Sequence, residues 1–330
     1  MRILLTGANG FIGSHLLEGL LGQGFDVAVL LRPTSDTQFI DPLLPRVDVR
    51  YGDLDSPDAL RQAARAAEIV IHCAAKTKAM RKAEYRAVNA EGTRNLLEAC
   101  SDSAGSVRQL IFLSSLAASG PGSVECPATE DAEPRPVSAY GRSKLLAEQY
   151  IHEFSRVPYT IMRPAAVYGP RDRDLFVAFR ATRNGLMPML KGGRQPFSNL
   201  YVGDLVRAVL GAIDRPACLG GTYHLAHPVP CTHREMAAKV AEAMERRPLR
   251  VYVPGWVLYP VCFVRGLIAR ITSRPGVLNL EKIPELTAPG WVCSTARAAR
   301  DLDFVAPTEL EDGVRQTLAW YETNGWLREG

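Results

Sequence analysis

The sequence has no pair of cysteines at the C-x-x-C spacing that many zinc and redox sites use. Its seven cysteines are scattered and odd in number: Cys73, Cys100, Cys126, Cys218, Cys231, Cys262 and Cys293. This pattern predicts reduced, mostly buried thiols in a cytoplasmic protein, with no metal site and no disulfide framework.

Long apolar runs and long basic runs are also missing. Ile3-Leu4-Leu5 is too short for the apolar core of a signal peptide and leads directly into a glycine-rich turn. Residues 251–264 are apolar and aromatic, but Pro254 and Pro260 interrupt them and they fall short of the roughly 20 residues of a membrane span. We therefore expect no transmembrane segment. The net charge of +4 is small for 330 residues, which argues against a nucleic-acid partner.

The chain begins with a strand, a glycine turn and a helix. Residues 3–6 predict a short buried strand, and apolar residues recur at helical spacing from Phe11 to Gln23. Gly7 permits a tight turn, Gly10 lets the backbone approach phosphates, and Gly13 lets the helix lie close to the strand. This order predicts an anion site, because backbone N–H groups and the positive helix end face a pyrophosphate.

With the preceding threonine the turn reads TGANGFIG, with glycines at G-x-x-G-x-x-G spacing. This string resembles the nucleotide-binding turn of the extended short-chain dehydrogenase/reductases, the epimerase/dehydratase-type superfamily. The resemblance implies an enzyme whose turn holds a dinucleotide through the three glycines together with Asn9, Phe11 and Ile12.

A second buried strand, residues 26–32, ends in an arginine. In the dinucleotide fold an acidic residue at this point binds the ribose 2′-hydroxyl of NAD, whereas a basic residue suits the 2′-phosphate of NADP. Arg32 occupies the position and no carboxylate does. The planar guanidinium donates two parallel bonds to a phosphate, so the sequence favours NADP, with NAD as the alternative.

Strands are also predicted over residues 47–54, 68–75 and 108–115, with helices between them. Asp53 and Leu54, at the end of the third strand, resemble the family's adenine contact, in which the carboxylate accepts from the amino group. Ala74 and Ala75 end the fourth strand and Lys76 follows it, where the cofactor is expected to lie close. His72, inside an apolar run, is interpreted as structural. Asn89, in a segment that resembles the family's N-x-x-G-T, is expected to position the next strand.

Five alternations of strand and helix predict an α/β fold with a Rossmann-type doubly wound parallel sheet. We expect the dinucleotide-binding domain to span residues 1–168. Residues 169–330 are expected to form mainly a smaller, substrate-binding α/β lobe, with about 195–230 returning to the first domain.

A candidate catalytic group follows the fifth strand. Ser115 ends that strand, and Tyr140 and Lys144 are four residues apart on a predicted helix, on one face. A nearby lysine cation and the nicotinamide charge are expected to lower the pKa of the tyrosine, which could then exchange a proton with substrate. Ser115 would polarise the substrate oxygen. The family resemblance implies that Tyr140 and Lys144 also contact the cofactor.

Two later segments extend the resemblance. Residues 163–170 match the family's R-P-x-x-V-Y-G-P pattern, which implies cofactor contacts by Pro164 and Val167, and residues 200–205 match its V-x-D-L element. Sugar-nucleotide dehydratases carry an Asp-Glu pair directly after the serine, where this chain has Leu116 and Ala117.

The remaining features concern the substrate. Nucleotide-sugar epimerases usually show an arginine and an aromatic residue before the V-x-D element, and residues 194–201 keep an arginine in an altered setting. Residues 251–264 are interpreted as a packing helix, as a lid over a hydrophobic substrate, or as an interfacial or dimer contact. The interpretation as a lid follows from a resemblance to 3β-hydroxysteroid dehydrogenases and dihydroflavonol reductases.

These observations predict an NAD(P)-dependent oxidoreductase that interconverts a secondary alcohol and a ketone on a fairly apolar small molecule. The alternative is a nucleotide-sugar epimerase with tightly bound NAD. A dinucleotide-sensing protein without turnover is a third class, against which the Ser115–Tyr140–Lys144 set argues. The sequence is compatible with a homodimer.

Overall fold

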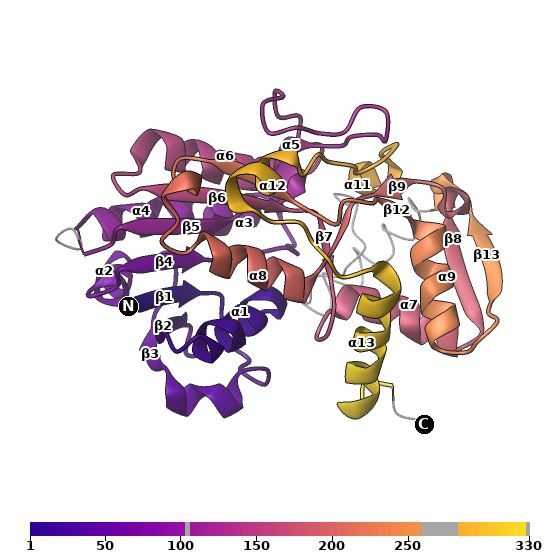
Figure 1. Ribbon diagram of the computed structural model, residues 1–330, viewed down its shortest axis with the longest axis horizontal. Coiled ribbons are helices and arrows are strands. Elements are labelled where there is room, and N and C mark those ends of the chain that lie inside the picture. Colours follow the sequence, from indigo (N-terminus) through magenta and orange to yellow (C-terminus); the bar gives the residue numbers. More distant parts are fainter. Residues whose placement is uncertain (103–105, 258–259, 261–282, 328–330) are drawn as a thin grey trace.

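The computed structural model describes residues 1–102, 106–257, 260 and 283–327, and in this part of the chain seven parallel strands form the central sheet (Figure 1). Its strand order is β3-β2-β1-β4-β5-β6-β11. The strands are β1 (Arg2–Thr6), β2 (Asp26–Leu31), β3 (Asp48–Tyr51), β4 (Ile69–His72), β5 (Gln109–Leu113), β6 (Tyr159–Pro164) and β11 (Thr222–Leu225). The expected doubly wound sheet is confirmed. The order reverses between β1 and β4, where such sheets bind ligands.

The strands are shorter than expected at their carboxyl ends. β2 ends at Leu31, β4 at His72 and β5 at Leu113, one to three residues before the predicted limits. Beyond these points the backbone leaves the ladder and turns over the edge of the sheet. The candidate site residues therefore lie in loops and helix starts rather than in strands.

Helices cover both faces of the sheet. One face packs against α1 (Phe11–Gly22), α8 (Val202–Ala212) and α12 (Ala296–Leu302). The other packs against α2 (Pro57–Ala64), α4 (Gly92–Asp102) and α6 (Ala139–Phe154). Successive residues of a strand alternate between the two cores: Ile3 and Leu5 belong to the first and Leu4 to the second.

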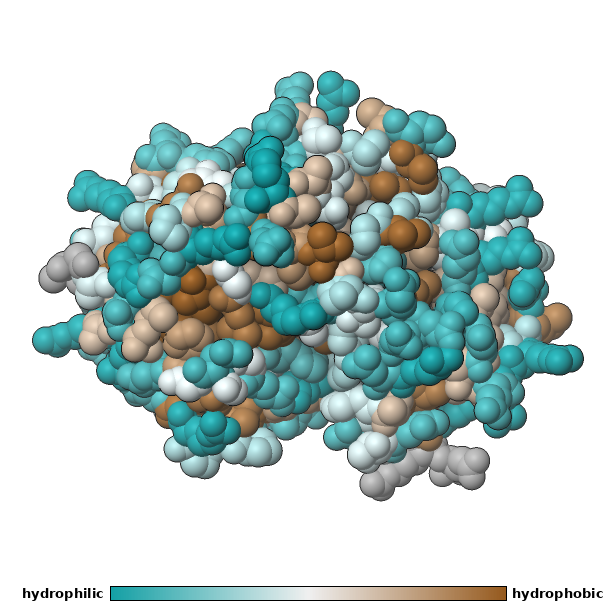
Figure 2. All heavy atoms as spheres, in the orientation of Figure 1, coloured by the Kyte–Doolittle hydropathy of each residue, from teal (hydrophilic) through white to brown (hydrophobic). Residues whose placement is uncertain are grey.

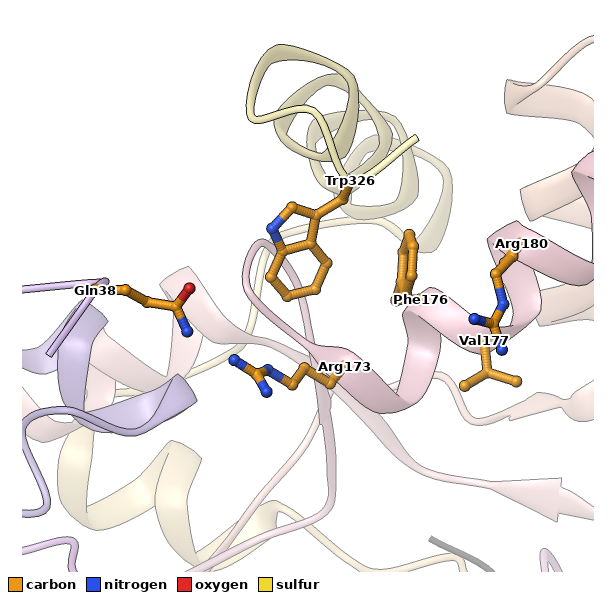
Figure 3. A pocket seen from close by; sticks show the side chains of 6 residues that line it. All are labelled: Gln38, Arg173, Phe176, Val177, Arg180 and Trp326. Carbon is orange, nitrogen blue, oxygen red and sulfur yellow. The ribbon is translucent and has the colours of Figure 1, made fainter. Parts of the chain in front are cut away.

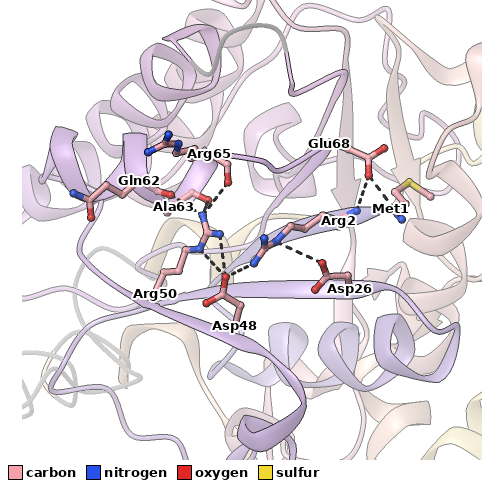
Figure 4. A network of polar contacts seen from close by, with 9 residues as sticks. All are labelled: Met1, Arg2, Asp26, Asp48, Arg50, Gln62, Ala63, Arg65 and Glu68. Atoms are coloured by element: carbon pink, nitrogen blue, oxygen red, sulfur yellow. Dashed lines mark hydrogen bonds and ion pairs between the residues drawn. The ribbon is translucent and has the colours of Figure 1, made fainter.

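A polar network stabilises the amino-terminal edge of the sheet, opposite the edge where the candidate site residues lie (Figure 4). Asp48 accepts bonds from both Arg2 and Arg50. The Arg50 guanidinium also donates to carbonyl oxygens at the end of α2, at 2.6, 2.7 and 3.0 Å: those of Gln62, Ala63 and Arg65. These are carbonyl groups that a helix end leaves without an intrahelical partner, and the cation complements the helix dipole.

The second half of the described chain adds three two-stranded sheets: β7 (Ala166–Tyr168) with β10 (Asn199–Tyr201), β9 (Pro196–Phe197) with β12 (Cys231–Thr232), and β8 (Leu186–Leu190) with β13 (Leu249–Val253). An aromatic cluster packs α7 (Arg173–Arg183) and α9 (His233–Ala243) against α13 (Leu310–Thr323).

The short helical elements are α3 (Lys82–Tyr85), the π-helical turn η2 (Arg86–Glu91), α5 (Leu116–Ser119), α11 (Ile283–Thr287) and the 3₁₀ turns η1 (Asp41–Arg46), η3 (Lys191–Gly193), η4 (Pro216–Cys218) and η5 (Gly255–Val257). Among the residues that the structure describes, no helix is long and apolar enough to cross a bilayer.

His72 is fully buried at the end of β4 and links three elements. Its ring nitrogens lie 2.7 Å from the Thr6 hydroxyl of β1 and 3.0 Å from the Thr93 hydroxyl of α4. Burial, with a smaller effect of the nearby Lys144 charge, lowers the pKa of His72 to about 3. These contacts support a structural role for this histidine.

Acid should therefore destabilise the fold through His72. Between the unfolded pKa of about 6.5 and the folded value of about 3, the unfolded chain binds the extra proton, so stability falls as pH falls below 6.5. The loss at pH 5 is about 2 kcal/mol from this residue. The free energy of unfolding can be measured with denaturant at pH 7 and at pH 5. Between these two pH values it should fall by about 2 kcal/mol less in His72→Gln than in the native protein. His152→Gln, at an exposed histidine, should keep the full drop, and equal drops in all three proteins would contradict the assignment.

Candidate active site

The turn between β1 and α1 is shaped by close backbone contacts. A Cβ at Gly7, where φ is +74°, would lie 2.7 Å from the Ala74 backbone, and a Cβ at Gly13 would lie 1.9 Å from the Gly7 carbonyl oxygen. A Cβ at Gly10 would meet only that oxygen, at 3.4 Å. In the described chain no side chain caps α1. Phe11, Ile12 and Gly13 thus begin a helix whose start carries no side-chain cap, as an anion-binding helix N-terminus requires.

The loop after β2 lies beside this turn. The Asn9 amide donates to the Asp36 carbonyl oxygen at 3.1 Å. Arg32 is exposed directly after β2, and its backbone closes a turn with Ser35 through two bonds of 2.9 and 3.2 Å. The arginine is thus placed at the end of β2, as the sequence predicts for a 2′-phosphate contact.

The two residues after β3 are held locally. The Asp53 carboxylate accepts a bond from the Leu54 N–H at 2.7 Å, and the Leu54 carbonyl accepts one from Asn95 of α4 at 2.8 Å. Leu54 is buried against Gly92, where a Cβ would approach it to 2.8 Å. The second Asp53 oxygen has no bond to the backbone among these contacts, which leaves an acceptor for an adenine amino group.

Asn89 holds the loop after β4 to the candidate catalytic helix. Its side chain accepts from the Lys76 N–H at 2.7 Å and donates to the Lys76 carbonyl at 3.0 Å and the Ser143 hydroxyl at 2.9 Å. The structural role of Asn89 agrees with expectation, but its partners are this loop and α6 rather than the next strand. The Lys76 ammonium pairs with Glu84 of α3. Ala74 and Ala75 precede it, with the Ala74 N–H 3.2 Å from the Thr6 hydroxyl.

Ser115 and Tyr140 meet in a hydrogen bond between their side chains. Ser115 is the N-cap of α5, and its hydroxyl accepts from the Ala117 N–H at 3.1 Å. Tyr140 is in the first turn of α6, which Ser138 caps by accepting from the Gly141 N–H at 3.0 Å. Two helix caps therefore fix the two hydroxyl groups against each other.

Lys144 is buried one turn further along α6. Its ammonium donates to the Leu113 carbonyl of β5 at 2.6 Å and lies 4.2 Å from the centre of the Phe112 ring. Burial lowers the pKa of Lys144 to about 8, against the opposing influence of Cys73 and Glu148. This amine therefore titrates much closer to neutrality than an exposed lysine does.

The expected lowering of the tyrosine pKa is not seen in the protein by itself. Burial raises the pKa of Tyr140 well above its usual value, which outweighs the lowering by the Ser115 bond. The charge of Glu285, from α11, raises it further. The sequence prediction considered the lysine and nicotinamide charges and could not foresee how completely the fold would remove this hydroxyl from water.

A buried ion pair that sequence reasoning missed supports α6. Arg163 of β6 donates to both oxygens of Glu148 through its Nε, at 3.0 and 3.2 Å, and the Ser114 hydroxyl also donates to Glu148. Arg163 further donates to the Ser119 hydroxyl of α5 at 2.9 Å. The pair thus joins α6 to α5 and to the ends of β5 and β6. The available signal was spacing, because Glu148 follows Lys144 by four residues.

Two further predicted cofactor contacts lie beside this pair in the fold. Pro164 ends β6, and Val167 belongs to β7, half-buried against the core that covers α1 and α8. Both follow the carboxyl end of a central strand, as the loops after β1, β2, β3, β4 and β5 do. The topology therefore brings all the predicted residues to one edge of the sheet.

A surface cavity of about 400 Å³ lies elsewhere, between the loop after β2, α7 and the C-terminal segment (Figure 3). Gln38 and Arg173 point toward one another beneath Trp326. None of the predicted site residues lines it. Arg173 lies 3.9 Å from Asp36 and over the Trp326 ring, so its charge already has partners.

Chemically, the arrangement suits proton exchange with a substrate oxygen. One hydroxyl, Tyr140, can donate or accept the proton, and a second, Ser115, can hold the same oxygen by a hydrogen bond. Because burial lowers the pKa of Lys144 to about 8, the fraction of this amine that carries a positive charge changes with pH near neutrality. The glycine turn lies against the backbone that follows β4, where the sequence predicts a dinucleotide.

Comparison with known proteins identifies the family to which the chain belongs. The model of the NAD dependent epimerase/dehydratase family matches residues 3–226. Ceramide reductase from Caulobacter vibrioides is 29% identical over 98% of this chain and 96% of its own length. UDP-glucose 4-epimerase from Vibrio cholerae is 27% identical over 96% of this chain and 94% of its own. The crystal structure of gox2253 covers 99% of both chains at 26% identity, with a TM-score of 0.82.

The family match spans more than half of the chain and includes the glycine turn, the serine and the tyrosine–lysine pair. An NAD(P) cofactor is typical of this family. The protein is therefore an enzyme of the NAD-dependent epimerase/dehydratase family, the extended short-chain dehydrogenase/reductases.

Proposed function

We propose that the enzyme is an NADP(H)-dependent oxidoreductase that interconverts a secondary alcohol and a ketone on an apolar small molecule. The observation that carries this proposal is the Ser115–Tyr140 hydrogen bond above buried Lys144, with Leu116 and Ala117 in place of carboxylates after the serine. Elimination from a sugar needs an acid and a base at that point, whereas alcohol oxidation does not.

In this reaction Tyr140 accepts the hydroxyl proton of the alcohol, or donates it to the ketone in the reverse direction. Ser115 keeps the oxygen in place through a hydrogen bond. The charge of Lys144 favours the phenolate when Tyr140 gives up its proton, and thus offsets part of the cost of burial. The glycine turn and Arg32 would hold the cofactor, which would supply the hydride chemistry at the adjacent carbon: NADP⁺ for oxidation of the alcohol and NADPH for reduction of the ketone.

Apolar side chains next to the serine support an apolar substrate. Leu116, Ala165, Ala226 and Cys293 form a buried cluster, and Trp291 packs against it. Leu116 directly follows Ser115, so this cluster borders the reacting group on one side. The relative that reduces a ceramide is named for an apolar lipid, which agrees with this environment.

The segment from residue 194 to 201 offers little to a sugar diphosphate. Arg194 is its one basic residue and is exposed. The side chain of Gln195 is already engaged, because its amide donates to the carbonyls of Leu286 and Ala288 at 3.2 and 2.5 Å. An epimerase is the second candidate, since a UDP-glucose 4-epimerase matches almost the whole chain at a similar identity.

The apolar stretch 251–264 contributes less than expected to this argument. Residues 258–259 and 261–264 lie outside the described residues. Trp256 is 71% exposed, so it does not enclose a ligand in this structure. The case for an apolar substrate therefore rests on the cluster beside Ser115.

The cofactor preference depends on Arg32, and NADPH should bind more tightly than NADH. A charge-assisted bond to the 2′-phosphate contributes about 1.5–3 kcal/mol, or roughly ten- to a hundredfold in affinity. Arg32→Asp should reverse the order, whereas Arg46→Asp, an equal charge change at another exposed arginine, should keep it. Titration of nicotinamide fluorescence gives both constants. Equal affinity of the native enzyme for the two cofactors would refute the assignment.

Tyr140→Phe should lower turnover by about 10²-fold or more, because it removes the proton donor and keeps the ring. NADPH affinity should change little. Tyr150→Phe, on the same helix and bonded to Glu91 rather than Ser115, is the matched control and should retain turnover. Steady-state kinetics with the best ketone decide the matter, and near-native activity of Tyr140→Phe would exclude the tyrosine from proton transfer.

The substrate class can be tested by thermal shift with NADPH present. Ketones on ring or long-chain apolar compounds should raise the melting temperature and be reduced, and UDP or UDP-sugars should do neither. The reason is the apolar cluster at Leu116 and the single arginine of residues 194–201. Stabilisation by UDP-sugars alone, together with NAD that co-purifies, would assign the enzyme to the epimerases.

A further inference from the structure

The small sheet formed by β8 and β13 has an apolar outer face. The two strands run parallel, with Leu186 beside Leu249 and Pro188 beside Val251. The residues of opposite parity on β8, Met187 and Met189, are buried, so the first four side chains face outward.

This outer face is open to solvent. Leu186, Leu249 and Val251 are 48%, 68% and 39% exposed. Trp256, just beyond the end of β13, is 71% exposed. Tyr252 pairs with buried Met189 and therefore lies on the opposite side of the sheet. The sheet lies at one end of the molecule, with β13 outermost (Figure 1), and hydrophobic atoms flanked by hydrophilic ones are visible at this edge (Figure 2).

Arginines gather at the end where both strands begin. Arg180 and Arg183 are in the last turn of α7, just before β8, and Arg246 and Arg247 immediately precede β13. The Leu249 N–H donates to the Gly185 carbonyl at 2.8 Å, which holds the two starts together. The acidic residues nearest in sequence are on or just after α9: Glu242, which pairs with Lys239, and Glu245. From residue 246 to 257 the described chain has three arginines and no acidic residue.

We propose that this face, defined by Leu186, Pro188, Leu249, Val251 and the neighbouring Trp256, docks on an anionic lipid surface. Exposed leucine and valine can enter the boundary between headgroups and acyl chains, and tryptophan is a side chain favoured at that depth. The arginines alongside then meet the negative surface potential. Docking here would bring an apolar substrate to the enzyme, although the proposal does not depend on which substrate the active site takes.

Charge decides between this occupant and a second copy of the chain. A two-fold contact through this face would place the arginines of both copies at one interface, and none of the residues that define the face is acidic. Unpaired like charges disfavour such a dimer, whereas an anionic membrane neutralises them. A nucleic-acid duplex would use the arginines and leave the apolar face without a partner.

The test is flotation of the full-length enzyme with vesicles of pure phosphatidylcholine and of phosphatidylcholine with 30% phosphatidylglycerol. Binding is expected to the anionic vesicles, weakly to the neutral ones, and less at high salt. Each arginine contributes about fivefold. The double variant Arg246→Glu/Arg247→Glu should therefore bind at least about 25-fold more weakly, and Leu249→Ser/Val251→Ser about tenfold more weakly.

The matched control is Arg61→Glu/Arg65→Glu/Tyr51→Ser, at exposed residues of β3 and α2, which should bind as the native enzyme does. Absence of binding to anionic vesicles, equal binding to both vesicle types, or native binding by the variants at β13 would overturn the proposal. A dimer seen by ultracentrifugation without lipid, and abolished by Leu249→Ser/Val251→Ser, would assign the face to a second copy instead.

Discussion

The contact between the glycine turn and the end of β4 is the constraint on which the rest of the site depends. The backbone at Gly7 approaches that of Ala74 so closely that a Cβ would lie 2.7 Å away, and Gly13 stacks the helix directly on the Gly7 carbonyl. Only backbone atoms separate the glycine turn from the strand that leads to Lys76. A substitution at either glycine would push α1 or β4 outward, and would change the space for a dinucleotide before any catalytic group moved.

The candidate catalytic hydroxyls depend on a second constraint, the buried pair of Glu148 and Arg163. Their side chains are 1% and 5% exposed, and breaking such a pair by removing one charge typically costs about 3–5 kcal/mol. The pair sets the position of α6 against β5 and β6, and so determines where Tyr140 and Lys144 lie. Lys144, one turn before Glu148 on α6, donates to a β5 carbonyl. The helix is therefore anchored to the sheet at two successive turns.

Local patterns in the sequence were enough to predict the parallel sheet, the glycine turn and the residues that meet at its edge. The spacing of Tyr140 and Lys144 predicted a shared helix face, and the assignment of their roles stays a prediction. Burial and long-range partners could not be read from the sequence. The raised pKa of Tyr140 depends on how completely distant segments exclude water, and the approach of Glu285 depends on a helix from the far end of the chain. Asn89 was expected to act on the nearest strand, but its amide reaches a loop and a helix that sequence order does not bring together.

The π-helical turn at Arg86–Glu91 gives Asn89 this reach. A π turn accommodates one residue more than an α turn, and such turns arise mostly as single bulges at functional sites. Relative to an uninterrupted helix, one extra residue rotates everything on one side of the bulge by about 100°. The segment that precedes α4 can therefore present Glu84 and Tyr85 toward Lys76 and Tyr140, while α4 itself keeps its apolar face on the sheet. A one-residue deletion here would repair the helix and misalign the active site, so this enzyme depends on a helical irregularity that a stability-driven redesign would remove first.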